Sequence, residues 1–420
     1  MSEMTLKSRR LLGAAVGAVL VAWSAGGATA VMTSGAPDES TAARVASAPS
    51  GDPIVIGMSL PLSGPVADRA VPGMEGYQYW VDELNANGGL LGRPVELTVL
   101  DDQFDQQTAV SDYNRLISQD RVDLVLGTFS SDLNLAVAPV AERFEYVYVE
   151  PSGGADEIFE RDFHFLFFAQ PATTQKLPNQ FVDLIEQMPE AERPATVAFV
   201  QMDDPNTTQA AGIFEERLGA LGIETVYDET YAPDTSNFDT IANAIKQAAP
   251  DLVISGAVAG DGAALVRSFQ KVDFSPTMLY QTNSPTDPAF AEAIGEGNTE
   301  AIFTPLAWSS ESTFPSNVAF VEGFTEQFGH APVEDAANSY TAGQVLAAGV
   351  EAVGELDQPA IAEWLHANSV DTVVGPLSWD ESGRPDGELL LGQFRDGALR
   401  IVAPADAATA EIVYAKPDWQ

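Results

Sequence analysis

The sequence of 420 residues contains no cysteine, only 3 histidines and few basic side chains. The absence of cysteine excludes disulfide bonds, a thiol nucleophile, cysteine-ligated zinc and a lipid-modified N-terminal cysteine. The 61 acidic residues outnumber the 20 basic ones, which gives a formal net charge of −41. Because phosphate backbones and anionic lipids are bound through clustered lysine and arginine, this charge argues against nucleic acid and anionic membrane surfaces as partners.

Composition also bounds the class of protein and its habitat. With 45% apolar residues the chain can bury a large core, so global disorder is not expected, and its length allows two or three domains. The lysines are Lys7, Lys176, Lys246, Lys271 and Lys416. Acid-rich, lysine-poor surfaces suit concentrated salt, in which self-repulsion is screened, and composition alone leaves a high-salt habitat open.

The N-terminus has the three-part layout of an export signal. A basic start ends in the pair Arg9-Arg10, an uncharged apolar run covers residues 11–23, and a small-x-small cleavage site lies at residues 28–30. The arginine pair leaves the twin-arginine route open beside the general secretory route. Residues 11–32 are also about long enough to span a bilayer as an uncleaved anchor. Their many glycines and alanines make them only weakly apolar, so we favour cleavage.

Two N-terminal segments are therefore expected to lie outside the folded part. Residues 1–30 are predicted to be a signal peptide, and residues 31–52 are small, polar and proline-containing, as is typical of a flexible leader. The folded part is expected to begin near Pro53. The export signal predicts a periplasmic or secreted protein.

From Pro53 onward, predicted strands and helices alternate. Residues 54–62 form a continuous apolar run typical of a buried strand, residues 74–84 repeat apolar side chains at helical spacing, and residues 95–99 alternate as a second strand. Further strands are predicted at residues 122–129, 146–149, 196–200, 224–227, 252–254, 278–280 and 301–303, and a long helix after Glu334. Strand–helix units of about 25–30 residues predict parallel sheets with right-handed crossovers. Two such series predict an α/β protein of two lobes.

No catalytic or metal-binding motif is recognisable. The turn Gly260-Asp261-Gly262 lacks the third glycine of a dinucleotide fingerprint, and no phosphate-binding loop or nucleophile elbow occurs. The histidines stand in no metal-binding spacing. Residues 101–105 (DDQFD) lack the ligand pattern of a calcium loop and are better explained by helix capping. We therefore expect no enzyme, no cofactor and no metal, and a secreted hydrolase is the weakest hypothesis.

Two loops that follow predicted strands carry residues suited to a polar ligand. Ser130 and Ser131 precede a predicted helix, where hydroxyls and exposed backbone N–H groups can hold a carboxylate, although a simple helix cap explains them equally well. Gly153 and Gly154 allow close approach of the backbone to a ligand, although an ordinary turn is the favoured alternative. Because ligands of open parallel sheets bind at the carboxyl ends of the strands, function is expected in these loops.

Three segments carry a resemblance to a known family. They are NGGLLGRPVEL at residues 87–97, DDQFDQQTAV at 101–110 and VVGPLSWDESG at 373–383. In this order and spacing the chain resembles type 1 periplasmic binding proteins, and more narrowly the leucine/isoleucine/valine-binding branch of the hydrophobic amino acid transporter family, which serves ABC importers. The similarity runs from about Pro53 to the C-terminus.

The resemblance implies two lobes, each a mainly parallel sheet flanked by helices, joined by three hinge crossovers. Segment by segment, lobe 1 corresponds to residues 53–170 plus 306–376 and lobe 2 to residues 171–305 plus 377–420, with crossovers near Gln170, Pro305 and Pro376. A ligand would bind between the lobes and be trapped by their closure, and a membrane permease could distinguish the closed form from the open one.

The resemblance also implies ligand contacts at matching positions. These are Ser130, Ser131, Gly153 and Gly154 in lobe 1, and Thr207, Ala259 and Gln281 in lobe 2. Arg69 could attract a carboxylate at the cleft mouth or be a solvated surface residue, and Trp308 could stack on an apolar ligand part or pack in the hinge. A family hydroxyl is lost at Gly153–Gly154, and the usual acid is missing from residues 281–284, which leaves the ligand class open.

Together these features predict an exported substrate-binding protein. It would capture a branched-chain or hydrophobic amino acid, or a related carboxylate or amide, and deliver this solute to an ABC permease and ATPase complex. We expect a monomer. The alternative is a ligand-binding sensor of the same fold that signals to a partner protein.

Overall fold

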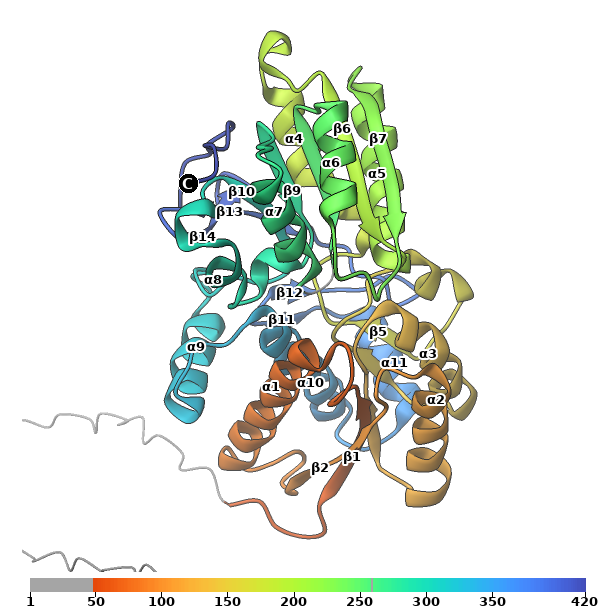
Figure 1. Ribbon diagram of the computed structural model, residues 1–420. Helices are drawn as coiled ribbons and strands as arrows, with labels where there is room; N and C mark the ends of the chain where they lie inside the picture. The colour runs from red at the N-terminus through yellow and green to blue at the C-terminus, as the bar shows by residue number, and fades with distance from the viewer. Residues whose placement is uncertain (1–47, 258–259) are drawn as a thin grey trace, which may run out of the picture. The chain divides into compact units, whose positions relative to one another are not determined.

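The computed structural model describes residues 48–257 and 260–420, which belong to one compact unit (Figure 1). The predicted signal peptide, residues 1–30, and most of the predicted leader lie outside the described residues. From β1 onward, strands and helices alternate as the hydrophobic pattern predicts. None of the helices in the described ranges is long and apolar enough to cross a membrane.

The first sheet has five parallel strands in the order β2-β1-β3-β4-β5. Its strands are β1 (Ile54–Leu60), β2 (Val95–Asp101), β3 (Leu124–Leu126), β4 (Tyr148–Glu150) and β5 (Leu166–Phe168). One face packs against α1 (Ala67–Ala86), α9 (Pro315–Phe328), α10 (Glu334–Val353) and α11 (Gln358–Ala367). The other face packs against α2 (Gln106–Arg115), α3 (Ser131–Phe144) and the 3-10 helix η2 (Asp156–Arg161). Helices therefore cover both faces, which explains why the strands read as apolar runs.

The second sheet has seven strands in the order β14-β13-β10-β9-β8-β6-β7. They are β6 (Thr196–Met202), β7 (Glu224–Tyr231), β8 (Leu252–Gly256), β9 (Met278–Gln281), β10 (Ile302–Leu306), β13 (Leu390–Arg395) and β14 (Ala398–Ala403). The strands β6 to β10 pair in parallel, whereas β13 and β14 join the edge beside β10 as an antiparallel hairpin. One face packs against α4 (Asn179–Gln187) and α5 (Pro205–Ala220), the other against α6 (Asp239–Ala248), α7 (Asp261–Lys271) and α8 (Phe290–Ile294). Two mainly parallel sheets flanked by helices confirm the predicted α/β class.

The chain passes between the two sheets more than once. It leaves the first sheet after β5, forms β6 to β10 in the second sheet, and returns through α9, α10 and α11 to the first. A small antiparallel pair, β11 (Val370–Thr372) and β12 (Gly375–Leu377), precedes the final hairpin β13–β14. Pro305 lies inside β10 and Pro376 inside β12. The exact lobe boundaries stay a prediction.

The helices α1 and α10 lie in close contact through glycine. A Cβ atom added at Gly76 would lie 2.0 Å from the carbonyl oxygen of Ala336, and one added at Gly343 would lie 2.2 Å from Trp80 Cδ2. Both distances are far inside van der Waals contact, so any larger residue would force the helices apart. This contact connects the start of the chain's folded part to a helix about 260 residues later, and both helices cover the same face of the first sheet.

We expect Gly76→Ala to lower the free energy of unfolding by about 1–3 kcal/mol, because the added methyl group overpacks the contact between α1 and α10. The matched control is Gly212→Ala on α5, where the position is exposed and nothing lies within 4 Å of the added Cβ. There, alanine should leave stability unchanged or raise it by up to about 1 kcal/mol. Denaturant unfolding of both variants measures the difference, and equal stabilities would contradict the prediction.

Candidate ligand-binding site

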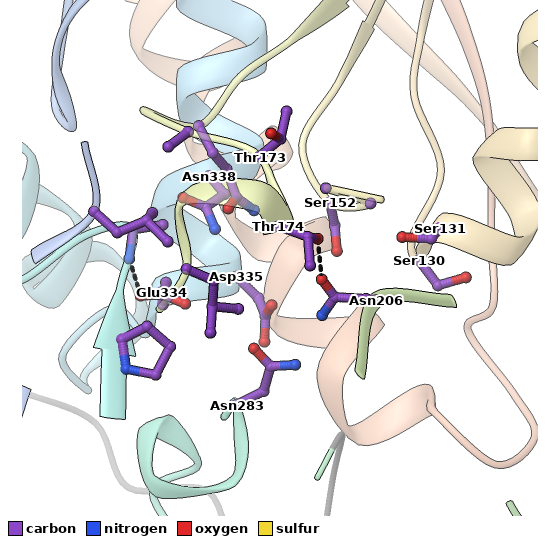
Figure 2. Close-up of a pocket in the computed structure, with 18 of the residues that line it drawn as sticks. Ser130, Ser131, Ser152, Thr173, Thr174, Asn206, Asn283, Glu334, Asp335 and Asn338 are labelled. Atoms are coloured by element: carbon purple, nitrogen blue, oxygen red, sulfur yellow. Dashed lines mark hydrogen bonds between the residues drawn. The ribbon is translucent and has the colours of Figure 1, made fainter. Parts of the chain in front are cut away.

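A cavity of about 100 Å³ lies among loops that follow strands of both sheets (Figure 2). From the first sheet, the loops after β3 and β4 contribute the serine loop, defined as residues 129–131, and the glycine loop, defined as residues 152–154. From the second sheet, the loop after β6 contributes Asp204, the first turn of α5 contributes Asn206, and the loop after β9 contributes Asn283. The first turns of α10 complete the lining with Glu334, Asp335 and Asn338. The cavity thus lies at the carboxyl ends of parallel strands, where such sheets bind ligands.

The serine loop lines the cavity and also begins α3. Ser130 adopts a left-handed backbone conformation with φ of 77°, and its hydroxyl caps the helix by accepting a hydrogen bond from the backbone N–H of Leu133 at 3.4 Å. The hydroxyl of Ser131 accepts a hydrogen bond from the backbone N–H of Ala155 at 3.2 Å, which ties α3 to the residue that follows the glycine loop. The helix cap foreseen as an alternative is therefore present. Each hydroxyl still carries a proton that it can donate to a ligand.

The glycine loop requires glycine because the backbone is crowded there. Gly153 has φ of 135°, and a Cβ atom on it would lie 2.8 Å from Asn134 Nδ2 and 2.9 Å from the carbonyl oxygen of Ser130. The carbonyl of Gly154 accepts a hydrogen bond from the backbone N–H of Thr174 at 2.8 Å. A side chain at position 153 would push the two cavity-lining loops apart.

A buried polar network supports both loops from below. The side-chain amide of Asn134 donates to the carbonyl of Ser130 at 2.8 Å, to the carbonyl of Ser152, and to Glu150 Oε2 at 3.0 Å. The backbone N–H of Ser152 also donates to Glu150 Oε2, at 3.0 Å. Burial raises the pKa of Glu150 well above its usual value, because an ionised carboxylate would be poorly solvated there. Burial therefore favours the protonated, neutral form of Glu150 beneath the site.

Arg69 lines the cavity but is committed to an ion pair. Its guanidinium donates to both oxygens of Asp335, with Nη2 3.1 Å from Oδ1, and only 7% of the residue's surface is exposed. Arg69 is thus neither a solvated surface residue nor an unpaired cation at the cleft mouth. The pair joins the N-terminal end of α1 to that of α10, beside the glycine contact between these helices.

Glu334 is a second carboxylate at the start of α10. Its Oε2 accepts hydrogen bonds from the backbone N–H groups of Ala307 at 2.9 Å and Trp308 at 3.2 Å, just beyond the end of β10. Burial, together with repulsion from Asp335, raises the pKa of Glu334 to about 7. The carboxylate therefore connects the cavity to the segment in which the chain leaves the second sheet.

The second sheet supplies a third acid. Asp204 caps α5 by accepting hydrogen bonds from the backbone N–H groups of Asn206 at 2.9 Å and Thr207 at 3.4 Å. Burial, and then repulsion from Asp132, raises the pKa of Asp204 to about 6. Asn206 accepts a hydrogen bond from the hydroxyl of Thr174, which Figure 2 shows as a dashed line.

Several of the predicted contact residues come together in the cavity, and others do not. Arg69, Ser130, Ser131, Gly153 and Gly154 line it. Three others, Thr207, Gln281 and Trp308, are buried but do not line the cavity. Their side chains form hydrogen bonds with other parts of the protein. The hydroxyl of Thr207 donates to the carbonyl of Met202 at 2.6 Å, Gln281 Nε2 to the carbonyl of Gly262 at 3.1 Å, and Trp308 Nε1 to Asn317 Oδ1 at 2.6 Å. Ala259 lies outside the described residues.

Sequence reasoning did not identify the polar residues that α10, the start of α5 and the loop after β9 bring to the cavity. These are Glu334, Asp335, Asn338, Asp204, Asn206 and Asn283, with Thr173 and Thr174 beside them. The sequence does contain the acidic pair Glu334-Asp335 at the predicted start of a long helix. Acidic residues are common in the first turn of a helix, so the pair alone does not indicate a binding site. Within residues 48–257 and 260–420, no group of three or more His, Asp or Glu side chains is arranged to hold a metal ion.

Comparisons with known proteins agree with this geometry. The sequence model described as periplasmic binding protein matches residues 53–398. The chain belongs to the periplasmic binding protein family. Within it the chain is of the type 1, leucine/isoleucine/valine-binding kind, as the sequence segments predicted, and the family is one of solute-binding proteins rather than enzymes.

Relatives and solved structures of this family cover most of the chain. Leu/Ile/Val-binding protein homolog 7 of Brucella suis biovar 1 (strain 1330) is 26% identical over 381 residues, which is 87% of this chain and 95% of the relative. The solute-binding protein of an ABC transporter from R. palustris, solved with benzoate, has a TM-score of 0.76 at 22% identity and covers 86% of this chain and 98% of that one. LivJ from Streptococcus pneumoniae, solved with isoleucine, has a TM-score of 0.75 at 18% identity, with 84% and 100% covered. These structures confirm the two-lobed fold.

The raised pKa of Glu334 makes the stability of the protein depend on pH. Because the folded state holds this proton more tightly than the unfolded state, the contribution is fully present below the usual pKa of 4.5 and is lost as pH rises through about 7. We therefore expect the free energy of unfolding to fall between pH 5 and pH 8. Glu334→Gln, which keeps an oxygen for the two backbone N–H groups, should make this fall smaller.

Urea unfolding at constant salt between pH 5 and pH 8 tests this expectation. The matched control is Glu351→Gln, at an exposed position of the same helix, which should retain the wild-type slope. The acidic surface also weakens stability as pH rises, so the comparison between the two variants isolates Glu334. Identical slopes for both variants would show that Glu334 does not titrate in this range.

Proposed function

We propose that this chain is an exported substrate-binding protein that captures a small polar organic solute between two lobes and delivers it to an ABC permease and ATPase complex. The solute class is a branched-chain or hydrophobic amino acid, or a related carboxylate or amide. The observation that carries the proposal is the cavity itself, because its polar lining comes from the strand ends of both sheets. A ligand that contacts both would hold them together.

The size of the cavity supports a small solute. A cavity needs about 10–15 Å³ to hold one water molecule. The cavity of about 100 Å³ therefore has room for on the order of eight water-sized groups. This is the scale of a short amino acid or a small carboxylate. The structural neighbours support the same class, since one of the solved structures holds isoleucine and another benzoate.

Hydrogen bonds beside the cavity link the first sheet's layer to α5 of the second. The backbone N–H of Asp156, in η2, donates to Gln209 Oε1 at 3.1 Å, and Gln209 Nε2 donates back to Asp156 Oδ2 at 2.6 Å. The same carboxylate accepts from the hydroxyl of Thr173 at 2.9 Å and from Arg384 at 3.2 Å. This double hydrogen bond between Asp156 and Gln209 supports a closed arrangement that retains a ligand.

Export and delivery complete the proposal. The predicted signal peptide at residues 1–30 would direct the chain to the periplasm, or outside the cell, through the Sec or twin-arginine route. The proposed lobes, residues 53–170 plus 306–376 and residues 171–305 plus 377–420, would close on the solute as a monomer. The permease would then recognise the closed surface.

Thermal unfolding of residues 31–420 with a panel of solutes tests the proposal. The panel comprises aliphatic amino acids, short amides, urea, polyamines and aromatic carboxylates, in high and low salt. A ligand at about a hundredfold its dissociation constant should stabilise the protein by about 2.7 kcal/mol, which gives a clear shift in melting temperature. If no member of the panel shifts the melting temperature, the proposed ligand class is wrong.

Removing the link to α5 should release the ligand faster. We expect Gln209→Ala to raise the dissociation rate of a ligand found in the panel about five- to tenfold, with little change in association rate, because it removes hydrogen bonds that would hold the proposed lobes closed. Glu215→Ala, at an exposed position of the same helix, is the control and should bind as the wild type does. Stopped-flow fluorescence measures both rates, and an unchanged dissociation rate for Gln209→Ala would contradict the role of this contact.

A further inference from the structure

We infer that the captured solute carries a protonated nitrogen, which binds between Glu334 and Asn338 on the first turns of α10. This inference rests on the proposed function, because it names the ligand class of the same cavity. It separates solutes with an ammonium or amidinium group from carboxylates that have none. Three observations carry it: the charges that line the cavity, the geometry of Glu334, and the unsatisfied amide of Asn338.

The charges that line the cavity do not balance. Its acidic side chains are Asp204, Glu334 and Asp335, and Arg69 is the one basic side chain among the described lining residues. The guanidinium of Arg69 forms hydrogen bonds with both oxygens of Asp335, so these two charges compensate each other. Glu334 and Asp204 remain, and a cationic group on the ligand would compensate them. An added carboxylate without a cation would increase the imbalance.

Glu334 is positioned to receive such a group. Both of its backbone hydrogen bonds, from Ala307 and Trp308, fall on Oε2, so Oε1 keeps its lone pairs for a ligand. The two N–H groups fix the carboxylate without neutralising it. Glu334 is the first residue of α10, where the helix dipole amounts to about half a positive charge. When ionised, the carboxylate carries a full negative charge, which exceeds this half charge, so a cation bound at the helix end favours the ionised form.

Asn338 supplies the third observation, which is independent of the other two. It lies one turn further along α10, four residues from Glu334, so both side chains project from the same face of the helix. Only 2% of Asn338 is exposed, yet its Oδ1 accepts no hydrogen bond from the described residues. Buried polar atoms in native proteins nearly always have a partner, so an unpaired oxygen in a cavity wall indicates a missing donor. An N–H group on the ligand would supply it.

The opposite wall has a complementary character. The hydroxyls of Ser130 and Ser131 can donate a proton, and the glycine loop exposes backbone to the cavity. An acceptor on the solute can therefore face the serine loop while its nitrogen faces α10.

Matched pairs of probes test the ligand class by isothermal titration calorimetry on residues 31–420. The pairs are leucine with 4-methylpentanoate, which lacks the ammonium group, and benzylamine with benzoate. We expect the nitrogen-bearing member of a pair to bind at least tenfold more tightly. Carboxylates that bind as tightly as their nitrogen-bearing partners would overturn the inference and leave the proposed function standing. Silence of every probe, together with urea and polyamines, would contradict both.

Variants of α10 test the location of the subsite. Glu334→Gln keeps an oxygen for the two backbone N–H groups and should weaken binding of the nitrogen-bearing probe at least tenfold, with binding of the carboxylate unchanged or tighter. Asn338→Leu has similar size and should weaken the same probe severalfold. Glu351→Gln, exposed on the same helix, should bind as the wild type does. A Glu334→Gln variant that folds, by its melting temperature, and keeps the wild-type ratio between the paired probes would place the nitrogen elsewhere.

Discussion

The amide of Asn134 joins the two loops that form one wall of the cavity. It donates to the carbonyls of Ser130 and Ser152 and to Glu150, and accepts from the hydroxyl of Tyr148 at 2.6 Å. Asn134, Tyr148 and Glu150 are buried, so the loss of a hydrogen bond among them would leave a buried polar atom without a partner. The serine and glycine loops therefore hold their shape before any ligand arrives, and the ordering cost of binding is small.

One carboxylate connects the other wall to the path of the chain. Glu334 belongs to a helix that packs on the first sheet, but its hydrogen bonds reach the backbone just after β10 of the second sheet. A group that binds Glu334 from the cavity therefore acts on the segment through which the chain passes between the sheets. In the proposed function, the contact between Glu334 and the segment after β10 directly links recognition of the solute to the arrangement of the lobes.

The sequence predicted the elements with clear periodicity and the loops next to them, and it missed what depends on distant contacts. The strands β1 and β2, the helix α1 and the cavity positions of Ser130 and Gly153 follow from local patterns. The strand β5 was missed because a short aromatic run has no period, and the hairpin β13–β14 because its turn at Asp396-Gly397 was not recognised. Glu334 and Asn338 reach the cavity only because α10 returns to the first sheet some two hundred residues after the serine loop, which no local pattern encodes.

The order of the second sheet leaves β7 as an edge strand, with one row of backbone groups unpaired by another strand. Glu224, Asp228 and Glu229 are exposed along it. When two molecules approach edge to edge, these carboxylates meet their own copies and repel them before backbone hydrogen bonds can form. The acidic side chains thus protect this edge against intermolecular sheet growth, so that neighbouring molecules stay separate at high protein concentration.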